Sequence, residues 1–232
     1  MFTNKVASVT GGSSGIGKEV ARRFVEAGGS VEIGGRNAEK LAAAAEEIDA
    51  SGARVQMVAG DIADPKAGDM LVQKAEEAFG GVDVLFNNAG VFKPKPFLEL
   101  TVEEYDWFLD TILKGKFFMA QAAAKAMAKR GGGAIVQTGS LWALQAVGAT
   151  PSAAYSAANG GVHAMVRNLA LELASENIRV NAVAPAVVET PVYNTFMSDD
   201  QVAETLPGFN AFHPLGRNGR PADIADALMF LA

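Results

Sequence analysis

The chain has 232 residues, of which 49% are hydrophobic, and a formal net charge of −6 at pH 7. This length and hydrophobic content predict one large folded domain rather than a disordered chain. The acidic balance argues against nucleic-acid binding, which needs a basic surface to neutralise phosphates. The absence of cysteine excludes disulfides and thiolate metal sites. Two distant histidines, His163 and His213, are more typical of structural roles, so no metal centre is expected.

The N-terminus and the hydropathy pattern predict a soluble cytoplasmic protein. Residues 1–4 lead directly into an apolar segment with no charged leader, so no signal peptide is expected. No apolar run approaches the roughly 18 residues that a membrane span needs. We therefore expect neither a membrane partner nor a nucleic-acid partner.

Short apolar segments alternate along the chain with longer segments of helical character. Several apolar segments lack polar alternation, which is typical of parallel strands buried on both faces. The expected strands are residues 5–9, 30–34, 54–58, 82–86, 134–137 and 178–182. The expected helices are residues 15–27, 37–51, 66–79, 101–130, 153–175 and 221–232.

Local signals support several helix boundaries. Asn37 can cap the second helix, and Pro65 and Pro221 suit the first turn of a helix. The strand–helix alternation predicts right-handed crossovers. It therefore predicts an α/β fold with a single doubly wound parallel sheet, flanked by helices on both faces.

No repeat or linker divides the chain, so residues 1–232 are expected to form a single domain. Residues 186–220 show no regular pattern apart from a short helix near 198–206. A long irregular segment within a compact domain is usually functional. We interpret it as a substrate lid.

A glycine-rich segment, residues 10–17, follows the first predicted strand and opens the first helix. Glycine permits a tight turn and close approach of the backbone to a pyrophosphate. The helix N-terminus offers free N–H groups to the anion. A glycine cluster alone is a weak signal, but its place in the first strand–helix turn favours a dinucleotide site over a plain turn.

Several motifs resemble those of the short-chain dehydrogenase/reductase family, and together they span nearly the whole chain. Residues 10–17 are similar to its glycine motif, and residues 87–90 to its second signature. Ser140, Tyr155 and the segment 181–190 follow in the family's order at nearly its spacing. The resemblance implies a Rossmann-type NAD(P)-binding domain. It also implies an oxidoreductase that interconverts a carbonyl and a secondary alcohol by hydride transfer.

The resemblance also implies a set of cofactor contacts. Asp61 and Ile62 resemble the family pair that contacts adenine, although Asp61 could instead be an ordinary turn aspartate. The implied cofactor-binding residues are Gly11, Ser13, Ser14, Gly15, Ile16, Gly17, Arg36, Asp61, Ile62, Asn87, Ala89, Gly90, Tyr155, Asn159, Pro185, Val188 and Thr190.

The end of the second predicted strand bears on the choice of cofactor. In the family an acidic residue there selects NAD, whereas a basic residue just beyond it accommodates the 2′-phosphate of NADP. Here the acidic position is Gly35 and Arg36 follows it, while Glu32 lies too early to reach the ribose. An arginine can grip a phosphate with a bidentate fork. We therefore expect NADP(H) rather than NAD(H), unless Arg36 is simply solvated.

By the same resemblance, the catalytic residues are Ser140 and Tyr155. A tyrosine exchanges a proton with the substrate oxygen, and a serine orients that oxygen. The segment between them is about two residues longer than is usual in the family.

Two further groups of the family's active site are missing. Its lysine, four residues after the tyrosine, is replaced by Asn159, and its water-holding asparagine by Ile112. A lysine there would lie one helical turn from the tyrosine and favour its phenolate, whereas asparagine carries no charge. A tyrosine with an ordinary pKa of ~10 is phenolate in about one molecule in a thousand at pH 7. We therefore expect greatly weakened turnover, with oxidation improving at high pH.

Lys114 and Lys116 are the candidate substitutes for the missing lysine. We expect Lys114 to face away from Tyr155, and neither lysine to compensate. By resemblance, a final strand is expected after the last helix, and residues 1–232 do not include it.

Apolar side chains in segments that border the nicotinamide in the family suggest an apolar pocket under a mobile lid, although some of them would be ordinary core residues. A small apolar ketone or secondary alcohol is the expected substrate. By resemblance we expect a homodimer or homotetramer packed through residues 101–130 and 153–175. The apolar residues are Phe92, Phe97, Leu141, Trp142, Tyr193, Phe196, Met197, Phe209 and Phe212.

Two functional interpretations stay open. Ser140 and Tyr155 favour an enzyme, because a pure cofactor sensor has no need of them. Ile112 and Asn159 favour a dinucleotide-binding sensor or regulatory protein with little or no activity. An apo structural protein would leave the glycine-rich segment without a role.

Overall fold

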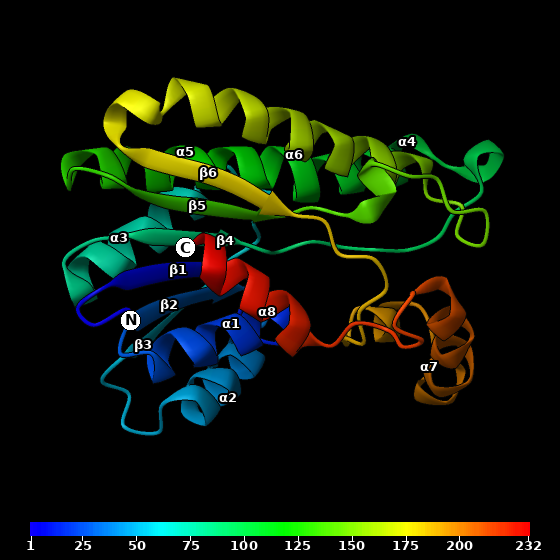
Figure 1. The fold of residues 1–232 in the computed structure, drawn as a ribbon, viewed down its shortest axis with the longest axis horizontal. Coiled ribbons are helices and arrows are strands. Elements are labelled where there is room, and N and C mark those ends of the chain that lie inside the picture. Colours follow the sequence, from blue (N-terminus) through cyan, green and yellow to red (C-terminus); the bar gives the residue numbers. More distant parts are fainter.

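Six parallel strands form one sheet in the order β3-β2-β1-β4-β5-β6 in the computed structural model, which describes residues 1–232 (Figure 1). This confirms the predicted doubly wound α/β fold. All six predicted strands are present, each within two residues of its expected ends. The strands are β1 (Val6–Thr10), β2 (Ser30–Gly35), β3 (Val55–Ala59), β4 (Val84–Asn87), β5 (Gly133–Thr138) and β6 (Ile178–Val183).

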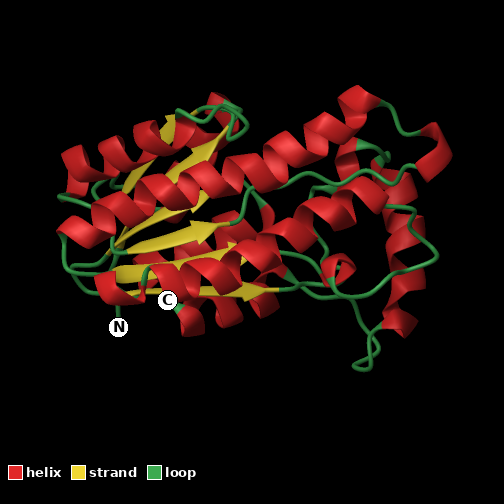
Figure 2. Ribbon diagram, turned by 90° about the horizontal axis from the view of Figure 1, so that it is seen from above, coloured by secondary structure: helices red, strands yellow, loops and turns green.

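Helices cover both faces of the sheet (Figures 1 and 2). Helices α1, α2 and α8 pack on one face, and α3, α5 and α6 on the other. Because each face has its own apolar core, the strands carry apolar side chains on both sides and show little polar alternation. The helices are α1 (Gly15–Glu26), α2 (Ala38–Ile48), α3 (Ala67–Phe79), α4 (Val102–Phe108), α5 (Gly115–Lys129), α6 (Ala153–Glu172), α7 (Asp199–Thr205) and α8 (Pro221–Leu231).

The predicted helix over residues 101–130 is divided into α4, a π-helical segment (Leu109–Lys114) and α5. A π-helical turn inside a helix is rare and often lies at a functional site. This one carries Ile112, the position at which the family has its asparagine. Gly115 follows it, and a Cβ atom there would lie 2.7 Å from the Ile62 carbonyl oxygen, so the helix passes close to the loop after β3.

Two of the three predicted helix-boundary signals are confirmed. The Asn37 side chain accepts a hydrogen bond from the Lys40 backbone N–H at 2.8 Å and caps α2. Pro221 is the first residue of α8. The prediction for Pro65 is wrong, because α3 begins at Ala67 and Pro65 precedes its N-cap.

The order of the strands reverses between β1 and β4, which pair with each other in parallel. In such sheets ligands bind at this switch point, beyond the carboxyl ends of the strands. Residues 186–220 extend beyond this end of the sheet and contain α7, the expected short helix, and two 3₁₀ segments (Figure 1). No helix of the chain is both long enough and apolar enough to span a membrane.

Candidate active site

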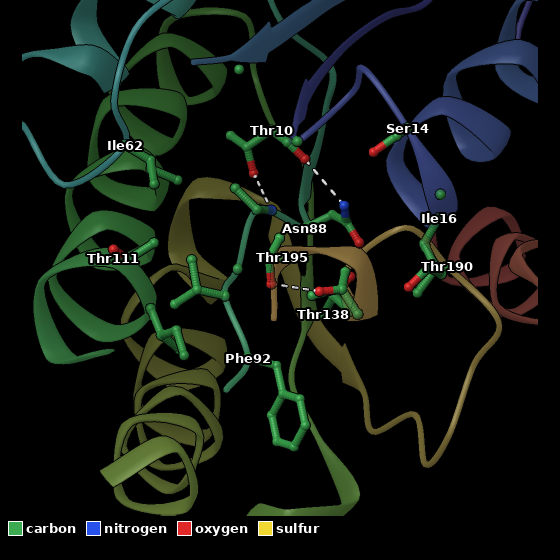
Figure 3. Close-up of a pocket in the computed structure, with 18 of the residues that line it drawn as sticks. Thr10, Ser14, Ile16, Ile62, Asn88, Phe92, Thr111, Thr138, Thr190 and Thr195 are labelled. Atoms are coloured by element: carbon green, nitrogen blue, oxygen red, sulfur yellow. Dashed lines mark hydrogen bonds between the residues drawn. The ribbon is translucent and has the colours of Figure 1, made fainter. Parts of the chain in front are cut away.

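A cavity of about 450 Å³ lies at the carboxyl ends of the strands, beside the switch point (Figure 3). Its size is typical of a small-molecule site. The glycine-rich turn forms one wall, with Thr10, Ser14 and Ile16, and the opposite wall carries Ile62 and Thr111.

The glycine-rich turn has the geometry of a phosphate cradle. Gly15 has φ +53°, which favours glycine. A Cβ atom on Gly17 would lie 2.2 Å from the Gly11 carbonyl oxygen, so only glycine lets α1 start this close to the turn. The N-cap residue Ser14 makes no side-chain capping bond. The first N–H groups of α1 therefore face the cavity without a side-chain partner, which fits an anionic pyrophosphate.

Residues 87–90 close the cavity behind this turn. The backbone N–H of Ala89 donates to Thr10 Oγ1 at 2.9 Å, and Asn88 Nδ2 donates to the Thr10 carbonyl at 3.3 Å (Figure 3). Thr10 Oγ1 also donates to Asn87 Oδ1 at 3.2 Å. These bonds fix the ends of β1 and β4 relative to each other.

Fifteen of the 17 predicted cofactor contacts, Tyr155 and Asn159 among them, form part of the cavity wall, together with Ser140. Two predicted contacts do not line it: Gly17 packs against the Gly11 carbonyl, and Asn87 is fully buried behind the wall. Asn88, not Asn87, presents its side chain to the cavity.

The expected adenine end is polar and open. Arg36 and Asp61 line it, and the exposed Arg36 side chain makes no ion pair or hydrogen bond within the chain. Lys40, one turn along α2, lines the same end and was missed because nothing in the sequence separates it from an ordinary helix lysine. Glu32 is fully buried within the sheet, which confirms that it cannot reach the cavity.

Ser140 and Tyr155 lie in the same cavity wall. Ser140 is buried, and its Oγ accepts a hydrogen bond from the Trp142 backbone N–H at 3.2 Å. Burial raises the pKa of the Tyr155 hydroxyl, although hydrogen bonding from the Ser140 and Asn159 side chains partly opposes this rise. Tyr155 therefore stays protonated at neutral pH. The Phe92 ring packs edge-on against it, with centroids 5.0 Å apart.

The two departures from the family pattern are both buried in this wall. Asn159 Nδ2 donates to the Tyr155 carbonyl oxygen, one turn back along α6, at 3.0 Å. Ile112 packs in an apolar cluster with Phe108 and Val162. Neither side chain brings a charge to Tyr155.

The two nearby lysines behave differently. Lys114 forms an ion pair with Asp110 on the surface, with Nζ and Oδ1 2.8 Å apart, and does not line the cavity, as predicted. Lys116 is only 2% exposed, lines the cavity and donates from Nζ to the Thr138 carbonyl. Burial lowers the pKa of its ammonium group to about 7. Spacing alone could have pointed to it, because it lies four residues after Ile112 and shares its helical face.

Aromatic side chains form the remaining wall, on the side of residues 186–220. Phe92, Trp142, Tyr193 and Phe209 line the cavity, as the apolar pattern predicts. The prediction is wrong for Phe97, which is 72% exposed. The remaining predicted residues lie outside the wall: Leu141, Phe196, Met197 and Phe212.

Comparisons with known proteins agree with this geometry. The short chain dehydrogenase family profile matches residues 5–201. The chain is 38% identical over 229 residues to the (2S)-[(R)-hydroxy(phenyl)methyl]succinyl-CoA dehydrogenase subunit BbsD of Thauera aromatica, covering 99% of this chain and 89% of that protein. It is 36% identical to a 3alpha-hydroxysteroid dehydrogenase of Mediterraneibacter gnavus, covering 100% and 91%. It is also 36% identical to an L-rhamnose 1-dehydrogenase (NAD(P)(+)) of a Sphingomonas species, covering 100% and 90%.

A solved structure shows the same likeness in three dimensions. A short-chain type dehydrogenase/reductase from Mycobacterium marinum has a TM-score of 0.92 and 31% sequence identity, covering 100% of this chain and 89% of that one. In both sequence and fold, therefore, the chain belongs to the short-chain dehydrogenase/reductase family of oxidoreductases.

Proposed function

We propose that this protein is an NAD(P)-dependent oxidoreductase that interconverts a carbonyl and a secondary alcohol. One observation carries the proposal: Ser140 and Tyr155 lie in the wall of the same cavity as the phosphate cradle. The cradle, Arg36 and Pro185 would hold the dinucleotide. When bound, the nicotinamide would supply or accept the hydride.

The protein's own part in the reaction is to position and protonate the substrate oxygen. In reduction, the Tyr155 hydroxyl gives its proton to the carbonyl oxygen as that oxygen gains negative charge, and Ser140 Oγ orients the same oxygen. The raised pKa of Tyr155 keeps the donor protonated, which suits reduction. Oxidation needs the phenolate and should improve at high pH.

The cofactor preference rests on the end of β2. Arg36 lines the cavity with no partner in the protein, and Gly35 provides no carboxylate to bind the ribose hydroxyls. Lys40 adds a second positive charge at the same end. We therefore infer that NADP(H) binds more tightly than NAD(H).

The aromatic wall favours a small apolar substrate. Phe92 and Trp142 face Tyr193 and Phe209, which residues 186–220 contribute, and we propose that this segment is the substrate lid of a single domain. The relatives' names include a CoA thioester, a steroid and a sugar, so family membership does not select among these substrates.

We further propose that turnover is weaker than in a chain with the family's asparagine and lysine. Ile112 cannot hold a relay water, and Asn159 brings no charge. Exposed Phe117 on α5 and Leu171 on α6 support a homodimer or homotetramer packed through these helices.

A dinucleotide-binding sensor with little or no activity is the second candidate. It is favoured by one observation: Asn159 bonds back to the Tyr155 carbonyl and leaves the tyrosine without a lysine beside it. Such a protein would bind NADPH without reducing any carbonyl.

The test is NADPH oxidation with a panel of apolar ketones, comparing this protein with Tyr155→Phe. Loss of the hydroxyl removes the proton donor, so kcat should fall by at least about 100-fold. The Kd for NADPH, measured by fluorescence, should change less than about threefold. NADPH binding without turnover on the whole panel would select the sensor. Unchanged turnover in Tyr155→Phe would refute the assignment of the proton donor.

A further inference from the structure

Lys116 is a buried ammonium group without a carboxylate partner. It lies in the first turn of α5 and is only 2% exposed. Its one hydrogen bond runs from Nζ to the Thr138 carbonyl, and no acidic side chain lies within ion-pair distance of it. Lysine is rarely buried without a countercharge, because desolvation strongly disfavours its charged form. An apolar side chain would fill the same space more stably, so packing alone does not account for Lys116.

The backbone around Lys116 is fixed by the ends of the central strands. Asn87 Nδ2 donates to the Lys116 carbonyl at 2.8 Å, and Asn87 Oδ1 accepts from Thr10 Oγ1 at 3.2 Å. The acceptor of the Lys116 ammonium, Thr138, lies two residues before Ser140. The backbone of Lys116 is therefore tied to the end of β4, and its ammonium group to the end of β5.

One residue of α6, His163, is within electrostatic range of this ammonium. Tyr155, Asn159 and His163 are spaced four residues apart and share one face of that helix. The pKa of His163 is lowered mainly by burial and next by the positive charge of Lys116. Tyr155 and Asn159 line the same cavity as Lys116. A lysine at position 159 would extend from this face towards the cavity that Lys116 also lines.

We propose that Lys116 is the cation of this active site and replaces, from the facing helix, the lysine that the family carries at Asn159. The inference rests on the proposed function. As Tyr155 gives up its proton, negative charge develops on the phenolic oxygen, and a fixed ammonium group in a low-dielectric cavity stabilises that charge. Lys116 thus acts through Tyr155 as a positioning residue, and it keeps some activity in a site that lacks the usual pair.

A purely structural role for Lys116 makes a different prediction. If the ammonium only holds the Thr138 carbonyl and the Ser140 turn, a charge placed at position 159 cannot take over its role. If the charge itself matters, it can be moved from α5 to α6. A double mutant therefore separates the two roles.

The experiment compares NADPH-dependent ketone reduction at pH 6.5 in Lys116→Met, Asn159→Lys and the double variant. Lys116→Met should lower kcat/KM at least about tenfold, and the double variant should regain at least about tenfold. Asn159→Lys should raise kcat/KM by a smaller factor in the wild-type background than in the Lys116→Met background, because two ammonium groups in one cavity suppress each other's charge. Lys114→Met, four residues from Asp110 on the surface, is the matched control and should stay within about twofold.

Several outcomes would overturn the proposal. They are full activity in Lys116→Met, a gain from Asn159→Lys that is as large in the wild-type background as in the Lys116→Met background, or a double variant as slow as Lys116→Met. If Tyr155→Phe abolishes turnover and Lys116→Met does not change it, the proposed function stands and this inference fails. If no variant turns over any ketone, both fail.

The pH profile of reduction should show a change that a purely structural role for Lys116 would not produce. Reduction should slow as the pH rises above about 7, where Lys116 loses its charge, and Lys116→Met should lack this decline. Among titratable groups, His163 on α6 is affected by this charge, and Tyr155 on α6 and Asp61 after β3 line the same cavity. The pKa of His163 is lowered and that of Tyr155 is raised, so neither accounts for a step near pH 7. The groups that β4 and β5 present, Asn87 and Thr138, are neutral.

A measurement on the free protein needs no turnover. The pKa of Lys116 is about 7 in the folded protein and about 10.4 in the unfolded chain, so wild-type stability should rise between about pH 7 and 10. Lys116→Met should melt at a higher temperature than wild type at pH 7, and this advantage should shrink towards pH 9.5. Equal Tm values for Lys116→Met and wild type at every pH would show that the ammonium is not held desolvated in the cavity, and would overturn the proposal.

Discussion

The two walls of the cavity meet different physical requirements. The cofactor-facing wall, from β1 to β2, follows the family pattern at every glycine, and its geometry is set by the backbone. The catalytic wall, from the π-helical segment to the start of α6, departs from the pattern at Ile112 and Asn159. A backbone cradle depends on contacts of a few ångströms, so its glycines cannot be replaced by larger residues. Electrostatic action falls more slowly with distance, so a charge can come from a different helix.

The largest effect is expected on the cofactor-facing wall, from Gly17→Ala. The new Cβ atom would lie 2.2 Å from the Gly11 carbonyl oxygen, so the turn and the start of α1 must move apart. A displacement of about 1 Å can cost about 100-fold at a site that depends on fixed geometry, and we expect the Kd for NADPH to rise by about that factor. Overpacking should also lower the free energy of unfolding by about 1–3 kcal/mol. Fluorescence titration and urea unfolding measure the two effects.

Gly148→Ala is the matched control, because a Cβ atom there would meet nothing within 4 Å. It should bind NADPH as wild type does and change the free energy of unfolding by less than about 0.5 kcal/mol. If Gly17→Ala behaved like this control, the cofactor-facing wall would be as tolerant as the catalytic wall.

The sequence was informative about the cofactor-facing wall because its signals are local. Glycines at fixed offsets after an apolar strand specify the turn wherever the rest of the fold lies, and the strand–helix alternation specifies the sheet. The catalytic wall depends on tertiary packing. No local signal shows that Asn159 bonds back along its own helix or that Phe97 points to solvent.

A smaller effect on the same wall should come from Arg36→Ala. Removing one charge-assisted phosphate contact should raise the Kd for NADPH by about tenfold or slightly more. The Kd for NADH should change less than about twofold, because NADH has no 2′-phosphate to lose a contact. Arg54→Ala, an exposed arginine outside the cavity, should leave both constants unchanged. Equal weakening of NADPH and NADH would contradict the inferred preference.

The smallest expected effect concerns Glu32, and it tests whether the cofactor-facing side of the sheet is free of buried charge. Glu32, in the middle of β2, is fully buried, and neither of its carboxyl oxygens has a hydrogen-bond partner. Ser8 lies opposite it on β1, but its hydroxyl is also unpartnered. Burial raises the pKa of Glu32 well above its usual value. This carboxyl group therefore stays protonated in the folded state at pH values where the unfolded chain ionises it.

The sign of the resulting pH dependence follows from linkage. Below about pH 4 the carboxyl is protonated in both states, and above about 4.5 ionisation favours the unfolded chain. Glu32→Gln cannot ionise, so its Tm should match wild type near pH 4 and exceed it increasingly at pH 6 and 8, by about 2–4 °C for each kcal/mol gained. Glu46→Gln, on the exposed side of α2, should show no such trend. A Tm difference for Glu32→Gln that stays constant with pH would mean that the carboxylate is accommodated in the core. In that case buried charge would not distinguish the catalytic wall from the rest of the fold, and the case for Lys116 would rest on its position in the cavity alone.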